Sequence, residues 1–159
     1  MGFASGRRFG GTGCSWTPRG HSVNEGRTIL IIEDDPFLLF TLSAYLEDSG
    51  FTCLRAADGE AGLEAFAAHR PDLVVTDLRM PGLDGLEVVA SLLREAPGFP
   101  VIVLSGASDM ATAKQALDLG ARLCLAKPVA DLAVFENTLR DMLPRQVPQG
   151  PGGTRLLGE

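Results

Sequence analysis

The chain has 159 residues, of which 45% are hydrophobic and 21% are charged, a composition that allows one sizeable folded core and differs from that of a disordered protein. The formal net charge is −6, and the acidic residues are concentrated in residues 27–143, which argues against a nucleic-acid-binding surface there. The three cysteines lack metal-ligand spacing, which argues against a disulfide scaffold or a zinc site. No apolar run is long enough for a membrane span or a signal peptide. We therefore expect a cytoplasmic protein that binds neither membranes nor nucleic acid.

The two ends of the chain differ in composition from the middle. Residues 1–26 are rich in glycine and carry scattered arginines, and residues 144–159 are rich in proline and glycine. Such segments bury too little apolar surface to order themselves. We therefore predict disordered tails at 1–26 and 144–159, with Pro144 ending the last helix, and a single folded domain at 27–143.

Between these ends, a short apolar run followed by a turn and an amphipathic stretch occurs five times. The expected strands are Thr28–Ile32, Phe51–Arg55, Leu73–Thr76, Val101–Leu104 and Leu123–Leu125. The helical spacing of one buried face is seen at Leu86, Val89, Ala90 and Leu93, and again at Leu132, Phe135, Leu139 and Met142. This alternation predicts an α/β fold with a doubly wound, five-stranded parallel sheet of the (βα)5 type and strand order 2-1-3-4-5.

Local signals mark several helix ends. Asp35 precedes a proline and has the features of an N-cap, and Asp84 lies three residues before Glu87 as in a capping box. Gly50 and Gly120 are expected to end helices. We therefore interpret Asp35 and Asp84 as caps and exclude both from the candidate site.

Polar side chains follow four of the five expected strands. Glu33 and Asp34 follow the first strand, Asp77 the third, Ser105 the fourth and Lys127 the fifth. In the strand order 2-1-3-4-5, these side chains lie at one edge of the sheet, where doubly wound folds bind ligands. Clustered carboxylates repel each other unless a cation lies among them, and Mg²⁺ favours a few carboxylates together with waters and phosphate oxygens. A lysine and a hydroxyl beside such a cation can bind a transferring phosphoryl group.

Taken together, these motifs resemble the receiver domain of two-component response regulators. The resemblance covers about residues 27–143 and is carried by Ile-Leu-Ile-Ile-Glu-Asp-Asp-Pro at 29–36, Asp-Leu-Arg-Met-Pro-Gly-Leu-Asp-Gly at 77–85, Leu-Ser-Gly-Ala at 104–107 and Lys-Pro at 127–128. It implies the flavodoxin-like fold and Mg²⁺ as the cofactor. The protein would accept a phosphoryl group from a histidine kinase or a histidine phosphotransfer protein. It would not be an enzyme with a separate substrate, although a receiver catalyses its own phosphoryl transfer and dephosphorylation.

The resemblance assigns roles to the acidic residues. Asp77 matches the phosphoacceptor. Asp34 and Asp77 match the Mg²⁺ ligands, together with the backbone carbonyl of Arg79, and Glu33 matches an acidic residue that acts on the metal through water. These roles come from the family and are expectations for this chain.

The remaining site residues match the family except at one position. Ser105 and Lys127 match the residues that bind the phosphoryl oxygens, and the bond between Lys127 and Pro128 is often cis in relatives. Cys124 stands where the family usually has Tyr or Phe, an aromatic side chain that turns inward as the hydroxyl moves towards the phosphoryl group. We expect metal binding and phosphorylation to survive this change, and the coupling to the surface of the fourth and fifth helices to be altered.

Because neither end of this sequence has room for a DNA-binding or catalytic domain, we also expect a single-domain regulator whose output is another protein. The docking face would lie around the fourth and fifth helices and would include Lys114, Gln115, Asp118, Arg122 and Cys124. Homodimer formation through this face is an open alternative. The sequence identifies neither the kinase, the stimulus and the output partner nor the phosphoryl lifetime and the role of the N-terminal tail.

Three other functions were weighed against the receiver. A flavodoxin-type electron carrier needs a hydroxyl-rich and glycine-rich phosphate loop after the first strand, where this chain has acidic residues. A phosphatase of the haloacid dehalogenase type needs a second acid two residues after the nucleophile, where this chain has Arg79. The remaining alternative is a receiver-like interaction module that docks a partner without phosphorylation. Cys124 supports this alternative, and the complete set of acidic residues, Ser105 and Lys127 counts against it.

Overall fold

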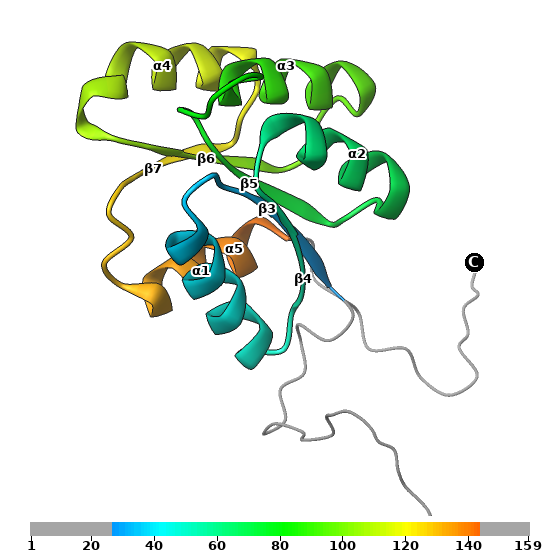
Figure 1. Ribbon diagram of the computed structural model, residues 1–159, viewed down its shortest axis with the longest axis vertical. Helices are drawn as coiled ribbons and strands as arrows, with labels where there is room; N and C mark the ends of the chain where they lie inside the picture. The colour runs from blue at the N-terminus through cyan, green and yellow to red at the C-terminus, as the bar shows by residue number, and fades with distance from the viewer. Residues whose placement is uncertain (1–26, 144–159) are drawn as a thin grey trace, which may run out of the picture.

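Five strands and five helices alternate along the chain in the computed structural model, which describes residues 27–143 (Figure 1). The strands are β3 (Thr28–Ile32), β4 (Thr52–Ala56), β5 (Leu73–Asp77), β6 (Val101–Ser105) and β7 (Leu123–Ala126). The helices are α1 (Pro36–Asp48), α2 (Gly59–His69), α3 (Gly85–Glu95), α4 (Met110–Leu119) and α5 (Leu132–Met142), with a short 3-10 turn η2 (Ala107–Asp109) before α4. The five predicted units are confirmed, with strand ends displaced by one residue; β4, for example, begins at Thr52 and not at Phe51. The two predicted tails, and Pro144 with them, lie outside the described residues.

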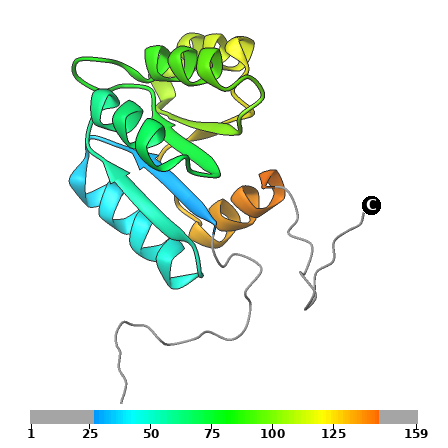
Figure 2. The ribbon, with the colours of Figure 1, turned by 90° about the vertical axis from the view of Figure 1, so that its right-hand side faces the viewer.

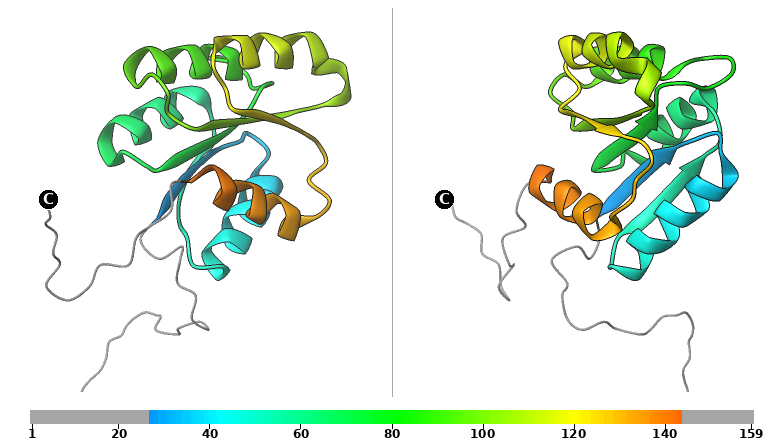
Figure 3. Two further views of the ribbon diagram at one scale, coloured as in Figure 1. Left: turned by 180° about the vertical axis from the view of Figure 1, so that it is seen from behind. Right: turned by 90° about the vertical axis from the view of Figure 1, so that its left-hand side faces the viewer.

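All five strands are parallel and lie in the order β4-β3-β5-β6-β7, which is the predicted order 2-1-3-4-5. α1 and α5 cover one face of the sheet, and α2, α3 and α4 cover the other (Figure 1). Figure 2 and Figure 3 show the same two layers from the sides and from behind. The chain moves from β3 outwards to β4 and then returns to β5 on the other side of β3. The carboxyl ends of β3 and β5 are therefore neighbours at the switch point of the sheet.

The strands are apolar throughout because both faces of the sheet are covered. Along β3, Ile29 and Ile31 pack into the cluster beneath α1 and α5, whereas Leu30 and Ile32 pack into the cluster beneath α2, α3 and α4. This alternation follows from the two-residue period of a strand. The apolar core thus lies on both sides of the sheet and leaves the strand ends to polar residues.

The predicted buried faces of α5 and α3 are confirmed, and that of α3 is wider than predicted. In α3, Val89 is fully buried as predicted, and Leu86 and Leu93 are partly buried and pack against the core. Val88 and Leu92, which lie outside the predicted set, are also fully buried. The cause lies in the neighbours of the helix, since α3 packs between α2 and α4 as well as on the sheet.

The predicted caps are all present. The carboxylate of Asp35 accepts hydrogen bonds from the first turn of α1, and Asp84 and Glu87 form the two reciprocal hydrogen bonds of a capping box at the start of α3. Gly50 and Gly120 have φ values of 105° and 121°, in the region that favours glycine; Gly50 follows the C-cap Ser49 of α1, and Gly120 directly follows α4. None of the helices within residues 27–143 is long and apolar enough to cross a membrane.

Candidate functional site

The predicted site residues lie at the carboxyl edge of the sheet. Glu33 and Asp34 follow β3 directly, Asp77 and Ser105 are the last residues of β5 and β6, and Lys127 follows β7. Neighbouring strands place these ends side by side, because β3 pairs with β5, β5 with β6, and β6 with β7. The buried strands therefore fix the backbone from which each polar side chain extends.

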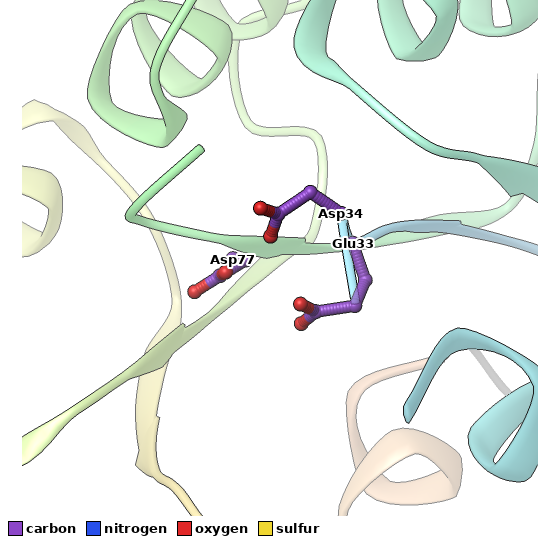
Figure 4. Close-up of side chains that lie close together, drawn as sticks. All are labelled: Glu33, Asp34 and Asp77. Carbon is purple, nitrogen blue, oxygen red and sulfur yellow. The ribbon is translucent and has the colours of Figure 1, made fainter. Parts of the chain in front are cut away.

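Three carboxylates converge at the switch point. Carboxylate oxygens of Glu33, Asp34 and Asp77 all lie within 4.8 Å of one another. The close-up in Figure 4 shows Glu33 and Asp34 side by side after β3, with Asp77 close to both at the end of β5. Glu33 and Asp77 are buried, with 1% and 3% of their surface exposed, whereas Asp34 is exposed. Two of the three carboxylates are thus buried, and the cluster is open to solvent on the side of Asp34.

Lys127 brings a positive charge to this cluster. Its ammonium Nζ lies 3.3 Å from Glu33 Oε1 and 3.2 Å from Asp77 Oδ2. Burial of the ammonium lowers the pKa of Lys127, but the charges of Asp77 and then Glu33 raise it by more, so that the net pKa is raised. The Lys127–Pro128 bond is cis, and the Lys127 N–H donates to the carbonyl of Ser105 at 2.8 Å. The loop that carries this charge is therefore tied to the end of β6.

The surroundings of Glu33 change the acidity of its carboxyl group. Burial raises the pKa of Glu33 to about 7; the hydrogen bond from the Asp35 N–H to Oε2 (3.1 Å) lowers it, Asp77 raises it and Lys127 lowers it. The second oxygen, Oε1, is buried and accepts no well-formed hydrogen bond, although the Lys127 ammonium lies nearby. A buried carboxylate oxygen without a hydrogen bond is unfavourable in a protein interior.

The donor set fits a hard divalent cation. Mg²⁺ prefers oxygen ligands and keeps several waters, which suits a cluster with one exposed carboxylate. A cation beside Asp34 and Asp77 would offset the repulsion between the acids, and a water bound to it could donate to Glu33 Oε1. The observation that supports the fit is this buried oxygen, whose one nearby cation, the Lys127 ammonium, is shared with Asp77.

Arg79 and Ser105 make side-chain contacts that the sequence does not predict. The backbone N–H of Arg79 lies 3.4 Å from Asp77 Oδ1, but its side chain extends to Asp109. The proposed role of the Arg79 carbonyl as a metal ligand stays a prediction. The hydroxyl of Ser105 accepts a hydrogen bond from the Cys124 thiol at 3.5 Å, so the residue at the usual aromatic position touches the residue expected to bind the phosphoryl group.

Asp109 is the residue near the site that sequence reasoning missed. Its carboxylate is buried, receives the Gly106 N–H on Oδ2 at 2.9 Å and pairs with the Arg79 guanidinium through Oδ1. The hydrogen bond from Gly106 lowers the pKa of Asp109; burial raises it, and Arg79 lowers it further. The available signal was an aspartate three residues after a glycine at the start of a helix, which also suits an ordinary cap.

The comparisons with known proteins agree with this geometry. The protein-glutamate methylesterase/protein-glutamine glutaminase of Natronomonas pharaonis is 35% identical over 127 residues, covering 78% of this chain and 36% of the relative. The Regulator of RpoS of Escherichia coli is 36% identical over 118 residues, covering 74% of this chain and 34% of the relative. This chain thus spans about a third of the length of these two relatives.

Solved structures point the same way. The crystal structure of a response regulator receiver domain protein from Clostridium thermocellum has a TM-score of 0.70 and 30% identity, covering 73% of this chain and 93% of that chain. The family model of the response regulator receiver domain matches residues 29–138. The chain therefore belongs to the response regulator receiver domain family.

Proposed function

We propose that Asp77 accepts a phosphoryl group from the phosphohistidine of a histidine kinase or a histidine phosphotransfer protein, while Asp34 and Asp77 hold Mg²⁺. Receiver domains are signalling domains of two-component systems and interact with histidine kinases and downstream effectors. The observation that carries the assignment to these residues is the convergence of three carboxylates and the Lys127 ammonium at the carboxyl edge of the sheet. This combination of charges suits phosphoryl transfer, which depends on positioning and electrostatic stabilisation.

Each residue of the site has its own role in the transfer of the phosphoryl group. An oxygen of Asp77 attacks phosphorus, the P–O bond forms as the P–N bond of the phosphohistidine breaks, and the imidazole nitrogen keeps the electron pair and takes a proton from solvent. Lys127, already 3.2 Å from Asp77 Oδ2, binds a phosphoryl oxygen, and the Ser105 hydroxyl donates to another. Bound Mg²⁺ supplies the charge that neutralises the phosphoryl oxygens. Glu33 would act on the metal through water.

The wider role is part of the same proposal. We place the docking of a downstream protein, in the cytoplasm, on the face of α4, β7 and α5, with homodimer formation through this face left to experiment. Lys114 and Asp118 are exposed charged residues on α4. Arg122 directly precedes β7, and Cys124 lies within it. Such a face would report the state of Asp77 through the elements that follow Ser105.

A second candidate is favoured by one observation. Cys124 occupies the position of the usual aromatic switch and donates a hydrogen bond to Ser105, so the familiar coupling between this hydroxyl and the α4 face is altered. A receiver that docks a partner without phosphorylation would be free of that coupling. It would have no use for the charged cluster, and for this reason it stands second.

Intact-mass spectrometry tests the proposal. The protein is incubated with acetyl phosphate in the presence and absence of Mg²⁺, beside Asp77→Asn and, as a matched control, the exposed α4 variant Asp118→Asn. We expect one phosphoryl adduct that requires Mg²⁺, is lost in Asp77→Asn and persists in Asp118→Asn. An adduct that persists in Asp77→Asn would refute the phosphoacceptor assignment. No adduct from either acetyl phosphate or a phosphorylated histidine kinase, together with no Mg²⁺ binding, would leave the second candidate as the better account.

A further inference from the structure

An ion pair joins the two loops that flank Asp77. Arg79 lies in the loop after β5, and Asp109 lies in the turn after β6; the Arg79 guanidinium pairs with Asp109 Oδ1 through Nε. The two partners differ sharply in environment, because the Arg79 side chain is 68% exposed and that of Asp109 only 4%. The other oxygen of Asp109 accepts the Gly106 N–H at 2.9 Å. Asp109 therefore connects Arg79 to the residue directly after Ser105.

The backbone of Arg79 lies beside Asp77, and its guanidinium pairs with Asp109. Its backbone N–H lies 3.4 Å from Asp77 Oδ1, so that rotations about the bonds of its long side chain can carry the guanidinium over Asp77 without moving the backbone. Lys127 is at present shared between Glu33 and Asp77. A phosphoryl group on Asp77 adds three oxygens and further negative charge to a cluster that already holds three carboxylates. The planar fork of an arginine matches such an anion well.

We propose that Arg79 exchanges partners: it pairs with Asp109 in the unphosphorylated protein and binds the phosphoryl oxygens once Asp77 is phosphorylated. This inference rests on the proposed function of Asp77. In it, Arg79 is a further phosphoryl-binding residue, and Asp109 is a positioning residue that acts through Arg79.

The exchange has a mechanical consequence. Asp109 is buried, and a buried carboxylate that loses its cation is unfavourable, so the turn that contains Gly106 and Asp109 is driven to open towards solvent. α4 begins at Met110, the next residue, and Gly106 follows Ser105. Release of the turn would therefore free Ser105 to approach the phosphoryl group and would move the start of α4. This gives the chain a link from Asp77 to α4 that does not need an aromatic side chain at Cys124.

The test measures the affinity for beryllofluoride, a mimic of the phosphoryl group, by calorimetry with saturating Mg²⁺. We expect Arg79→Gln to weaken binding about tenfold, because it removes a charged donor. Asp109→Asn keeps an acceptor for the Gly106 N–H but releases the guanidinium, and we expect it to tighten binding several-fold. In the Arg79→Gln background, Asp109→Asn should have no effect on this affinity. Arg94→Gln and Asp48→Asn, which change the same charges on α3 and α1, should leave binding unchanged.

A second readout follows the turn itself. Amide hydrogen exchange at Gly106 should become faster when beryllofluoride binds to the unsubstituted protein and should stay unchanged in Arg79→Gln. Weaker binding in Asp109→Asn, or an equal effect of Asp109→Asn with and without Arg79, would overturn the exchange and leave the ion pair as a structural tie. Failure of the unsubstituted protein to bind beryllofluoride with Mg²⁺ would instead overturn the proposed function, and the inference with it.

Discussion

The carboxyl group of Glu33 links the site to the stability of the whole domain. Burial raises its pKa in the folded protein to about 7, with Asp77 raising it as well and the Asp35 N–H and Lys127 lowering it, from an ordinary value of 4.5. Between these two values the folded protein holds a proton that the unfolded chain has released. The stability of the metal-free protein therefore falls as the pH rises through this window.

Replacing Glu33 by glutamine should remove this dependence. In the presence of a chelator, we expect Glu33→Gln to be more stable than the unsubstituted protein by about 1–3 kcal/mol at pH 8, since one pKa unit corresponds to about 1.4 kcal/mol. At pH 4.5 the difference should be small. Urea unfolding of both proteins across this range measures it, with the exposed α2 variant Glu64→Gln as a control. Parallel pH profiles for Glu33→Gln and the unsubstituted protein would contradict the burial of a raised-pKa carboxyl group.

The start of α3 shows how closely a helix approaches the site. A Cβ on Gly85 would lie 2.1 Å from the carbonyl oxygen of Asp77 and 2.6 Å from the Cα of Leu78, and these backbone atoms cannot turn aside. The N–H of Gly85 donates to the carbonyl of Leu78 at 3.0 Å, which holds the helix against the end of β5. Only glycine allows α3 to begin this close to the proposed phosphoacceptor.

We expect Gly85→Ala to destabilise the domain by about 1–3 kcal/mol, because the added methyl group must push α3 away from β5. Gly62→Ala is the comparison. The three nearest neighbours of its Cβ would all be side-chain atoms of the buried Ile32, at 2.4, 2.7 and 3.2 Å. Its effect should be smaller because a side chain shifts more easily than the backbone at the end of a strand. Denaturant unfolding compares the two, and equal losses of stability would show that the contact at Asp77 is not the rigid one.

Elements that depend on local signals could be predicted from the sequence. The strands are short apolar runs between turns, and caps such as Asp35 and Asp84 use side chains that bond to their own helix, so both were found to within a residue. The buried face of α3 is wider than predicted because it depends on two neighbouring helices that the periodicity of α3 does not contain. Val88 and Leu92 therefore face the core in addition to the predicted Val89.

The residues that form the site could be predicted from the sequence, whereas most of the contacts between them could not. Parallel strands bring their carboxyl ends to one edge, so Asp34, Asp77 and Lys127 could be grouped from strand order alone. The pairing of Arg79 with Asp109 depends on the conformations of two loops and on side-chain rotamers, and neither leaves a pattern in the sequence. For the same reason, the hydrogen bond between Cys124 and Ser105 could not be foreseen.

The molecule as a whole is two helical layers on one sheet, and the acidic cluster lies where both layers end. Two neighbouring strands meet there, since Asp34 follows β3 and Asp77 ends β5 in the middle of the sheet. A cation held between them binds only when the sheet is formed. Mg²⁺ should therefore stabilise the entire domain, by about 2.7 kcal/mol at a concentration 100 times its dissociation constant.

Asp34→Asn isolates this effect. Asp34 is exposed, so the substitution should change the stability of the metal-free protein little, yet it removes a charged ligand and should abolish most of the gain from Mg²⁺. Asp35→Asn is the matched control, because asparagine keeps the cap of α1 and the residue lies outside the cluster. Urea unfolding with and without Mg²⁺ gives both values. An equal gain from Mg²⁺ in Asp34→Asn and the unsubstituted protein would place the metal elsewhere, since only a site shared by β3 and β5 ties the cation to the formation of the whole sheet.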